Sequence, residues 1–417
     1  MGVENELAFH LRESLPSALS GESLKNQGFM VGALTANAEF VSGEPTEGKR
    51  IDHLLKAPRS QWYGGNDTLR SQEQVSGVNR HFAFWGAMMT PVSWDMLQLT
   101  KNTGITSGQL FDENFSIARM GETGRYTFYN QIETRYRQAV YGASLDLENS
   151  LWGIWQPDDN ENRAPESLAD IMSDSRQLHG LGPTELGKFD SRHVLGRTNT
   201  KFPGWEYVHS PRVFYFNHTD GKGGKPAAGT APKELTRDNI YQAMDEFLRP
   251  WDLIVKGMKM MPLDHRLFGL LSENKYILEN DKFAMRIYDG MGWEETKQVV
   301  RMHNTYIFSE PNAPENEMWG LHTGSPGGMN GTIYPVFWES SANRKGRQQI
   351  DTLVRGSNQA APGYATMGMR VRPIPFYHDE FFRFTSRADS GGSNIRLLYM
   401  WICQERWCQT VGRGWTI

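Results

Sequence analysis

The run that most nearly suggests chemistry is Gly221-Lys222-Gly223-Gly224-Lys225, whose glycines and lysines could surround a phosphate. A phosphate-binding P-loop needs the spacing G-x-x-x-x-G-K followed by Ser or Thr, between a strand and a helix. This run has neither the spacing nor the hydroxyl residue, and no strand–turn–helix pattern frames it. We therefore predict a flexible loop.

The remaining reactive side chains form no constellation. The 11 histidines lack the H-E-x-x-H motif and any paired metal spacing, and adjacent residues in His378-Asp379-Glu380 would alternate between strand faces. There is no G-x-S-x-G motif. Cys403 and Cys408 have no visible base partner, and their odd separation in a strand-like run predicts two free thiols. We predict no catalytic residue, no cofactor, no metal site and no enzyme.

Composition sets broader limits. The 417 residues are 38% hydrophobic and 22% charged, which indicates a soluble globular protein of one to three domains. The net charge of −4 argues against a general nucleic-acid-binding protein, because that function needs clustered Lys and Arg. No run of about 18 apolar residues occurs, so we expect no membrane contact.

The structural elements are better defined than any reactive site. The clearest is a helix from about 121 to 153, roughly 40 Å long at 1.5 Å per residue. Its apolar residues recur every three or four positions, which indicates one buried face. They are Tyr129, Ile132, Tyr136, Val140, Ala143, Leu147 and Leu151.

Extended segments precede this helix. Residues 1–45 are weakly patterned and are expected to form an extended arm that is ordered only by lying on something else. Residues 46–95 have turn residues at Gly64–Asp67 and an aromatic returning strand at His81–Trp85, which predicts a long protruding hairpin.

The remainder alternates between helices and strands. We predict a helix at Glu166–Asp174, a helix from Thr236 that stops before Pro250, a buried strand at Asp252–Val255 and a helix starting at Pro262. A strand at Ile333–Trp338 and two β runs, Arg370–Ser386 and Asn394–Gln409, follow. Long exposed strands are an aggregation hazard in a monomer, so these elements favour a protein whose copies cover one another.

The order of motifs carries a resemblance. RHFAFWGAMMTPVSWDMLQLTKNTG precedes the helix YNQIETRYRQAVYGASLDLENSLWG, and LGRTNTKFPGWEYV follows. This succession resembles tailed-bacteriophage major capsid proteins of the Hong Kong 97 type, with their aromatic E-loop, spine helix and "GIDR-x-x-x-P-x-W" crossing segment. Gly196-Arg197 and Pro203-Gly204-Trp205 match that segment, whereas its Ile-Asp is missing. The helix 235–248 and the following Asp252–Val255 resemble the family's axial-domain helix and strand.

The resemblance implies an α+β fold of the Hong Kong 97 type. Its parts would be an N-terminal arm (1–45), an E-loop (46–95), a peripheral domain (96–205, with the spine helix at about 121–153), an axial domain (206–331) and the C-terminal β-strands of the peripheral domain (332–417). The E-loop residues expected to contact neighbouring subunits are Arg59, Trp62, Tyr63, Arg70, Arg80, Phe84 and Trp85. The spine helix would be buried through Tyr129, Ile132, Tyr136, Val140, Leu147 and Leu151.

The implied function is that of a major capsid protein of a tailed double-stranded DNA bacteriophage. Pentamers and hexamers of the chain would close into an icosahedral shell in the host bacterial cytoplasm and become part of the virion. Implied partners are a portal protein, a decoration or cement protein, a scaffolding protein, and packaged DNA through weak non-specific contacts. An encapsulin-like compartment of the same fold is the alternative, and an α/β enzyme with an unrecognised site is a third class.

Two features refine these expectations. Some relatives crosslink an E-loop Lys to an Asn of a neighbour, but this chain has no Lys between Lys56 and Lys101, so such a crosslink is not expected. Only about 45 residues precede the E-loop, which favours a separate scaffolding protein over a fused one.

Overall fold

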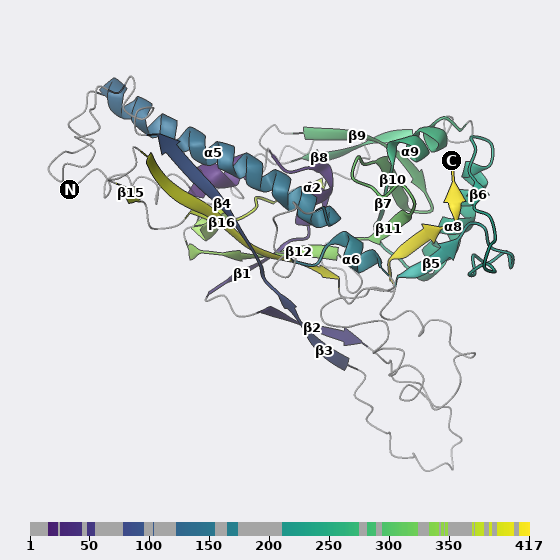
Figure 1. The fold of residues 1–417 in the computed structure, drawn as a ribbon. Coiled ribbons are helices and arrows are strands. Elements are labelled where there is room, and N and C mark those ends of the chain that lie inside the picture. Colours follow the sequence, from purple (N-terminus) through teal and green to yellow (C-terminus); the bar gives the residue numbers. More distant parts are fainter. Residues whose placement is uncertain are drawn as a thin grey trace, which may run out of the picture.

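In the computed structural model, the long helix α5 (Glu122–Trp152) lies along a six-stranded sheet, and an α/β unit follows at its C-terminal end (Figure 1). The description covers residues 16–23, 26–43, 48–54, 78–95, 103, 122–154, 165–173, 211–274, 282–288, 294–323, 333–341, 343–345, 347–348, 369–370, 372–378, 383–385, 390–403 and 408–417.

Helix α5 forms where the sequence predicts it and extends about 46 Å at 1.5 Å per residue. Its buried residues recur every three or four positions, as one face of a helix requires. Ile132, Tyr136, Val140, Leu147 and Leu151 are at most 1% exposed, and Tyr129 is partly buried against the same core.

The sheet beneath α5 is built around the strand β16 (Ser390–Cys403). β16 pairs antiparallel with β4 (Gly86–Asp95) over ten residues, from Ser390 opposite Asp95 to Tyr399 opposite Gly86. It also pairs with β12 (Ile333–Glu339), and the parallel edge strand β1 (Glu39–Ser42) lies beyond β12. Two short strands, β14 (Tyr377–His378) and β15 (Arg383–Thr385), complete the sheet.

The second sheet has eight strands and an apolar core on each face. Its central strands are therefore buried on both sides. One face joins the α5 core, and the other is covered by α8 (Ile240–Ile254) and α9 (His265–Ser272). Its strand order is β13 (Met369–Arg370), β8 (Lys282–Tyr288), β9 (Glu294–Met302), β10 (Thr305–Ser309), β7 (Lys259–Leu263), β11 (Met318–His322), β17 (Thr410–Arg413) and β5 (Arg212–Tyr215).

A two-stranded ribbon extends away from both sheets (Figure 1). It consists of β2 (Gly48–Leu54) and β3 (Val78–Phe84), antiparallel and in register from Gly48 opposite Phe84 to Leu54 opposite Val78. This is the base of the predicted hairpin, whose tip lies outside the described residues.

The prediction of an extended N-terminal arm is wrong for the described part of residues 1–45. Residues 16–23 are helical, and α2 (Phe29–Thr35) is buried at every position. Phe29 packs edge-on against Phe308 of β10, with ring centroids 4.9 Å apart, and β1 joins the sheet. The run FMVGALT shows no amphipathic pattern because a helix buried all round has no polar face.

The predicted strand at Asp252–Val255 is also wrong. Helix α8 continues through Pro250 to Ile254, and the strand that follows it is β7. Proline in a helix loses a hydrogen bond and clashes with the preceding turn, which is why it predicted a stop. Packing of Trp251 outweighs that cost, because this side chain is 1% exposed in the α8 core. Pro262 lies within β7, and α9 begins after Asp264.

The C-terminal strands are distributed differently from the prediction. β16 starts at Ser390, four residues before the predicted start at Asn394, and the run Arg370–Ser386 is described only as short strands. β17 pairs with β5 and β11 of the eight-stranded sheet, and β18 (Trp415–Thr416) pairs with β6 (Lys233–Glu234). The chain end thus belongs to the α/β unit. The predicted helix at 166–174 is confirmed as α6 (Leu168–Met172), with a reciprocal capping box between Ser167 and Asp170.

Candidate assembly surfaces

The β2–β3 ribbon is the first candidate surface, because the described residues provide no third strand beside it. An isolated two-stranded hairpin is marginally stable in water and needs another surface to cover it. Of the predicted contact residues, Arg80 and Phe84 lie in β3, paired in register with Asp52 and Gly48. The other predicted loop residues, Arg59, Trp62, Tyr63 and Arg70, lie outside the described part of the chain.

Trp85, the last predicted ribbon residue, contacts its own subunit. It lies between β3 and β4 and packs against a cluster on the face of the six-stranded sheet away from α5. The cluster consists of Tyr334, Val336, Met400 and Ile402. The Trp85 Nε1 atom is buried without a hydrogen-bond partner. Trp85 therefore fixes the root of the ribbon to the body.

The outward face of α5 combines charged and apolar side chains. Arg137 Nη2 lies 2.6 Å from Glu133 Oε1, one helical turn away. Glu148 accepts a 3.0 Å hydrogen bond from Trp152 Nε1 inside the subunit. Tyr126, Tyr141 and Leu145 are 73%, 53% and 46% exposed on this helix.

The C-terminal end of α8 is the second candidate surface. Leu253 and Ile254 are 71% and 54% exposed, although both are aliphatic and adjacent. The residues on either side of the pair are held firmly: Trp251 Nε1 donates a 2.8 Å hydrogen bond to the Cys408 carbonyl, and Val255 is buried. The end of the helix therefore presents two apolar side chains from a fixed backbone.

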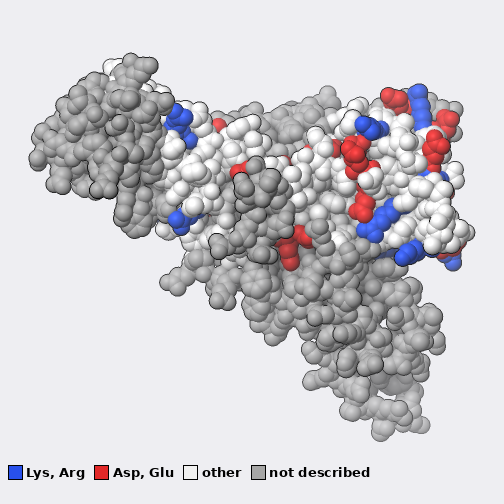
Figure 2. Space-filling model, viewed as in Figure 1, with Lys and Arg blue, Asp and Glu red and all other residues white. Residues whose placement is uncertain are grey.

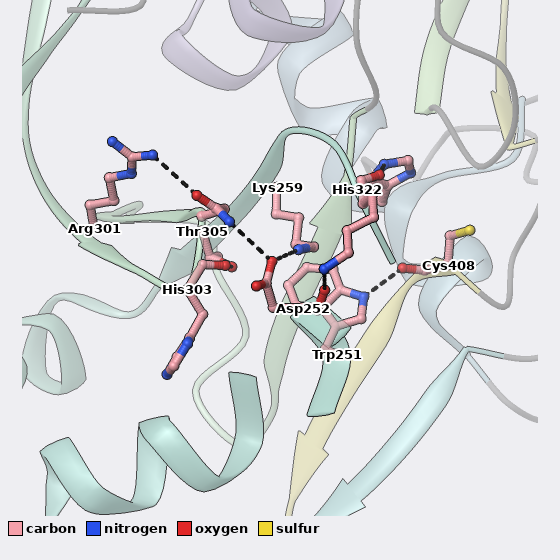
Figure 3. Close-up of polar contacts among 10 residues, drawn as sticks. Trp251, Asp252, Lys259, Arg301, His303, Thr305, His322 and Cys408 are labelled. Atoms are coloured by element: carbon pink, nitrogen blue, oxygen red, sulfur yellow. Dashed lines mark hydrogen bonds and ion pairs between the residues drawn. The ribbon is translucent and has the colours of Figure 1, made fainter. Parts of the chain in front are cut away.

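A buried ion pair lies directly beneath this helix end (Figure 3). Lys259 Nζ on β7 lies 2.5 Å from Asp252 Oδ1, and the Lys259 side chain is fully buried. Burial lowers the pKa of Lys259, while the hydrogen bond and charge of Asp252 oppose that shift. Burial raises the pKa of Asp252, but the hydrogen bond and charge of Lys259 leave it below 3.8.

The β9–β10 turn holds the same helix from another side. Its two residues, His303 and Asn304, have φ of 46° and 58°, the left-handed conformation of a tight hairpin turn. His303 Nε2 lies 2.5 Å from Asp245 Oδ1, and Asn304 Nδ2 donates to Asp252 Oδ1 at 3.4 Å. Two aspartates of α8 therefore fix the helix against this turn.

The Gly221–Lys225 run forms a local turn. Asp220 Oδ1 accepts hydrogen bonds from the backbone N–H groups of Lys222 and Gly224, at 2.9 and 3.2 Å. The Lys222 bond is the largest of the contributions that lower the Asp220 pKa. The amides that a phosphate would need are thus directed at a carboxylate.

Cys403 and Cys408 are both buried and are not joined by a disulfide, and Cys408 lies beyond the end of β16. Within the described ranges there is no group of three or more His, Cys, Asp or Glu side chains suited to a metal. Among these residues, no helix has the length and apolarity needed to cross a membrane. Figure 2 shows blue and red atoms interspersed at the end of the molecule that carries α8 and β6.

Comparisons with known proteins give similarity at the level of structure. No family model and no curated sequence matches the chain. A virus-like particle subunit from Pyrococcus furiosus is 9% identical, with 95% of this chain and 96% of that chain covered and a TM-score of 0.40. The cyanophage A-1(L) capsid is 11% identical, with coverages of 94% and 93% and a TM-score of 0.44. The SrpI encapsulin of Synechococcus elongatus is 9% identical, with coverages of 90% and 85% and a TM-score of 0.36.

Sequence reasoning missed the exposed pair on α8, although a signal for it was present. The buried residues of α8 continue at helical spacing across Pro250, from Phe247 and Leu248 to Trp251 and then Val255. Following this period places Leu253 on the opposite side of the helix from the core. Pro250 is the conflicting signal, because proline ordinarily ends a helix.

Proposed function

We propose that this chain is the major capsid protein of a tailed double-stranded DNA bacteriophage and assembles with copies of itself into an icosahedral shell. The observation that carries the proposal is the β2–β3 ribbon, which extends from the body as two strands to which the described part of the chain adds no third. Such a ribbon gains stability when a neighbouring copy covers it, and like contacts repeated by rotation close into rings.

The rest of the subunit suits the wall of a shell, because its helix and its two sheets are packed together. Helix α5 buries one face from Phe128 to Trp152, and Trp152 stacks on Trp319 of β11, with ring centroids 6.1 Å apart. This stack joins the helix to the α/β unit. In the proposed assignment, the ribbon belongs to the E-loop (46–95), α5 is the spine helix of a peripheral domain, and α8 and α9 belong to an axial domain (206–331).

The proposed partners follow from the resemblance stated for the sequence. They are other copies of the chain in pentamers and hexamers, a separate scaffolding protein, a portal protein, a decoration protein, and packaged DNA. Assembly would take place in the host bacterial cytoplasm, and the finished shell would be part of the virion.

Electron microscopy of the purified full chain, across a range of protein concentrations, tests the proposal. Closed icosahedral particles are the expected result, and monodisperse monomers at every concentration would overturn it. The content of particles purified from their native source then separates two kinds of shell. Double-stranded DNA supports the phage assignment, whereas protein cargo without DNA would replace it with an encapsulin-like compartment.

A further inference from the structure

The end of α8 carries the most exposed aliphatic pair among the described residues. Leu253 is 71% exposed and Ile254 is 54% exposed, and the two are adjacent. Single exposed apolar residues are common and need no explanation. This pair is different because the residues next to it are buried or hydrogen-bonded within the subunit.

Three separate contacts fix the backbone that carries the pair. Trp251, two residues before Leu253, is buried and hydrogen-bonded to the Cys408 carbonyl. Asp252 is held by Lys259 from the strand below, and Lys259 also lies 5.4 Å from the centre of the Trp251 ring. A binding element that is already rigid loses little conformational entropy when it binds, so this arrangement favours association.

The charges around the pair indicate the kind of partner. Arg249 pairs with Asp245 at 2.9 Å, and Lys256 Nζ donates to the Asp252 carbonyl at 2.8 Å. The two cations nearest to the pair along the chain, Arg249 and Lys256, therefore already have partners within the subunit. A nucleic acid would need cations free to contact phosphates, so the surroundings suit a protein surface with an apolar centre.

The small size of the pair favours a repeated contact. A stable isolated dimer buries about 800 Å² on each partner, and two aliphatic side chains supply far less. A ring of identical copies makes the same small contact many times, alongside other contacts such as the ribbon. A second copy of this chain is the occupant that satisfies these conditions.

We propose that Leu253 and Ile254 form an apolar contact with a second copy of this chain, and that Trp251 and the Asp252–Lys259 pair hold them in position. The inference rests on the proposed function, because it requires the chain to assemble. It adds a contact, made by the end of α8, that is separate from the β2–β3 ribbon.

The test compares full-length variants by light scattering and electron microscopy. Leu253→Asn/Ile254→Asn should raise the protein concentration needed for assembly by about tenfold or more, because two apolar side chains lose their burial. Its thermal unfolding should match that of the wild type, since both positions are exposed in the subunit. The matched control Leu253→Met/Ile254→Val keeps the apolar surface and should assemble as the wild type does.

The outcomes separate the two proposals. If wild type and the double Asn variant assemble at the same concentration, the α8 contact is disproved while the proposed function stands. If the wild type forms no particles, the proposed function fails first. Should the double variant unfold, the single change Leu253→Asn, at the more exposed position, gives the same decision.

Discussion

Lys259 Nζ on β7 lies 2.5 Å from Asp252 Oδ1 on α8, and none of the Lys259 side chain is exposed. The Asp252 side chain keeps 19% exposure, so the two charges differ in their access to water. Removing either partner leaves the other without its counter-charge, and the cost depends on how deeply the remaining charge is buried.

We predict that Asp252→Asn destabilises the subunit more than Lys259→Met does. Asp252→Asn leaves a buried ammonium without a carboxylate and should cost about 3–5 kcal/mol of unfolding free energy. Lys259→Met leaves a carboxylate that water can reach, so about 2 kcal/mol is expected. Urea denaturation measures both values. Equal losses of unfolding free energy would show that burial does not distinguish the partners. The double variant should lose less unfolding free energy than the two single variants lose together.

Subunit stability should fall in acid because of Asp252 and Asp264. Burial raises the pKa of each carboxyl, but hydrogen bonds and nearby charges outweigh this effect. The hydrogen bond and charge of Lys259 lower the pKa of Asp252 below its ordinary value. The Arg266 backbone N–H does the same for Asp264. A carboxylate with a lowered folded-state pKa contributes its full stability above the unfolded pKa and loses it as pH falls through the folded pKa. Urea denaturation between about pH 6 and pH 3 should show this loss. A loss as steep in Asp252→Asn as in the wild type would contradict the role of Asp252.

Gly153→Ala should destabilise the end of α5 by about 1–2 kcal/mol. Gly153 has φ of +75°, its N–H bonds to the Ser150 carbonyl, and the Ile154 N–H bonds to the Asn149 carbonyl, which is a Schellman motif. A Cβ at this position would also lie 2.9 Å from Ser167 Oγ. Thermal unfolding of the variant measures the effect.

Gly142 provides the matched control within the same helix. A Cβ there meets nothing within 4 Å, and its φ is not positive. Gly142→Ala should therefore stabilise the subunit by about 0.5–1 kcal/mol, because alanine loses less backbone entropy in a helix. If both substitutions shift the unfolding temperature in the same direction, the capping argument is wrong.

Replacement of the ribbon separates folding from assembly. Gly48 and Phe84 are opposite each other in register, so residues 49–83 can be replaced by an Asn-Gly turn without stretching the chain. Trp85 stays in place to cover its cluster. We expect a folded monomer with a circular dichroism spectrum and unfolding temperature close to those of the wild type, and no shells by electron microscopy. Shells of normal stability from this variant would remove the ribbon from the proposed function.

Some helices and strands can be predicted from the sequence alone, because residues close to them in the chain determine their structure. The buried face of α5 and the strand β12 were predicted because helical period and β-forming residues are local signals, and α6 carries a further local signal in its Ser167–Asp170 capping box. The base of the hairpin also follows, because its aromatic strand is flanked by turn residues.

Tertiary structure alone decided the remaining elements. Phe29–Thr35 is a buried helix because α5 and β10 surround it, and an apolar run cannot itself distinguish such a helix from a disordered arm. Helix α8 continues past Pro250 because Trp251 has a core to enter and Asp252 has Lys259 to meet, and both partners come from elsewhere in the fold. Leu253 and Ile254 are exposed as a consequence of that packing. Long-range contacts override local propensity when the stabilisation they provide exceeds the free-energy cost of the unfavourable local structure.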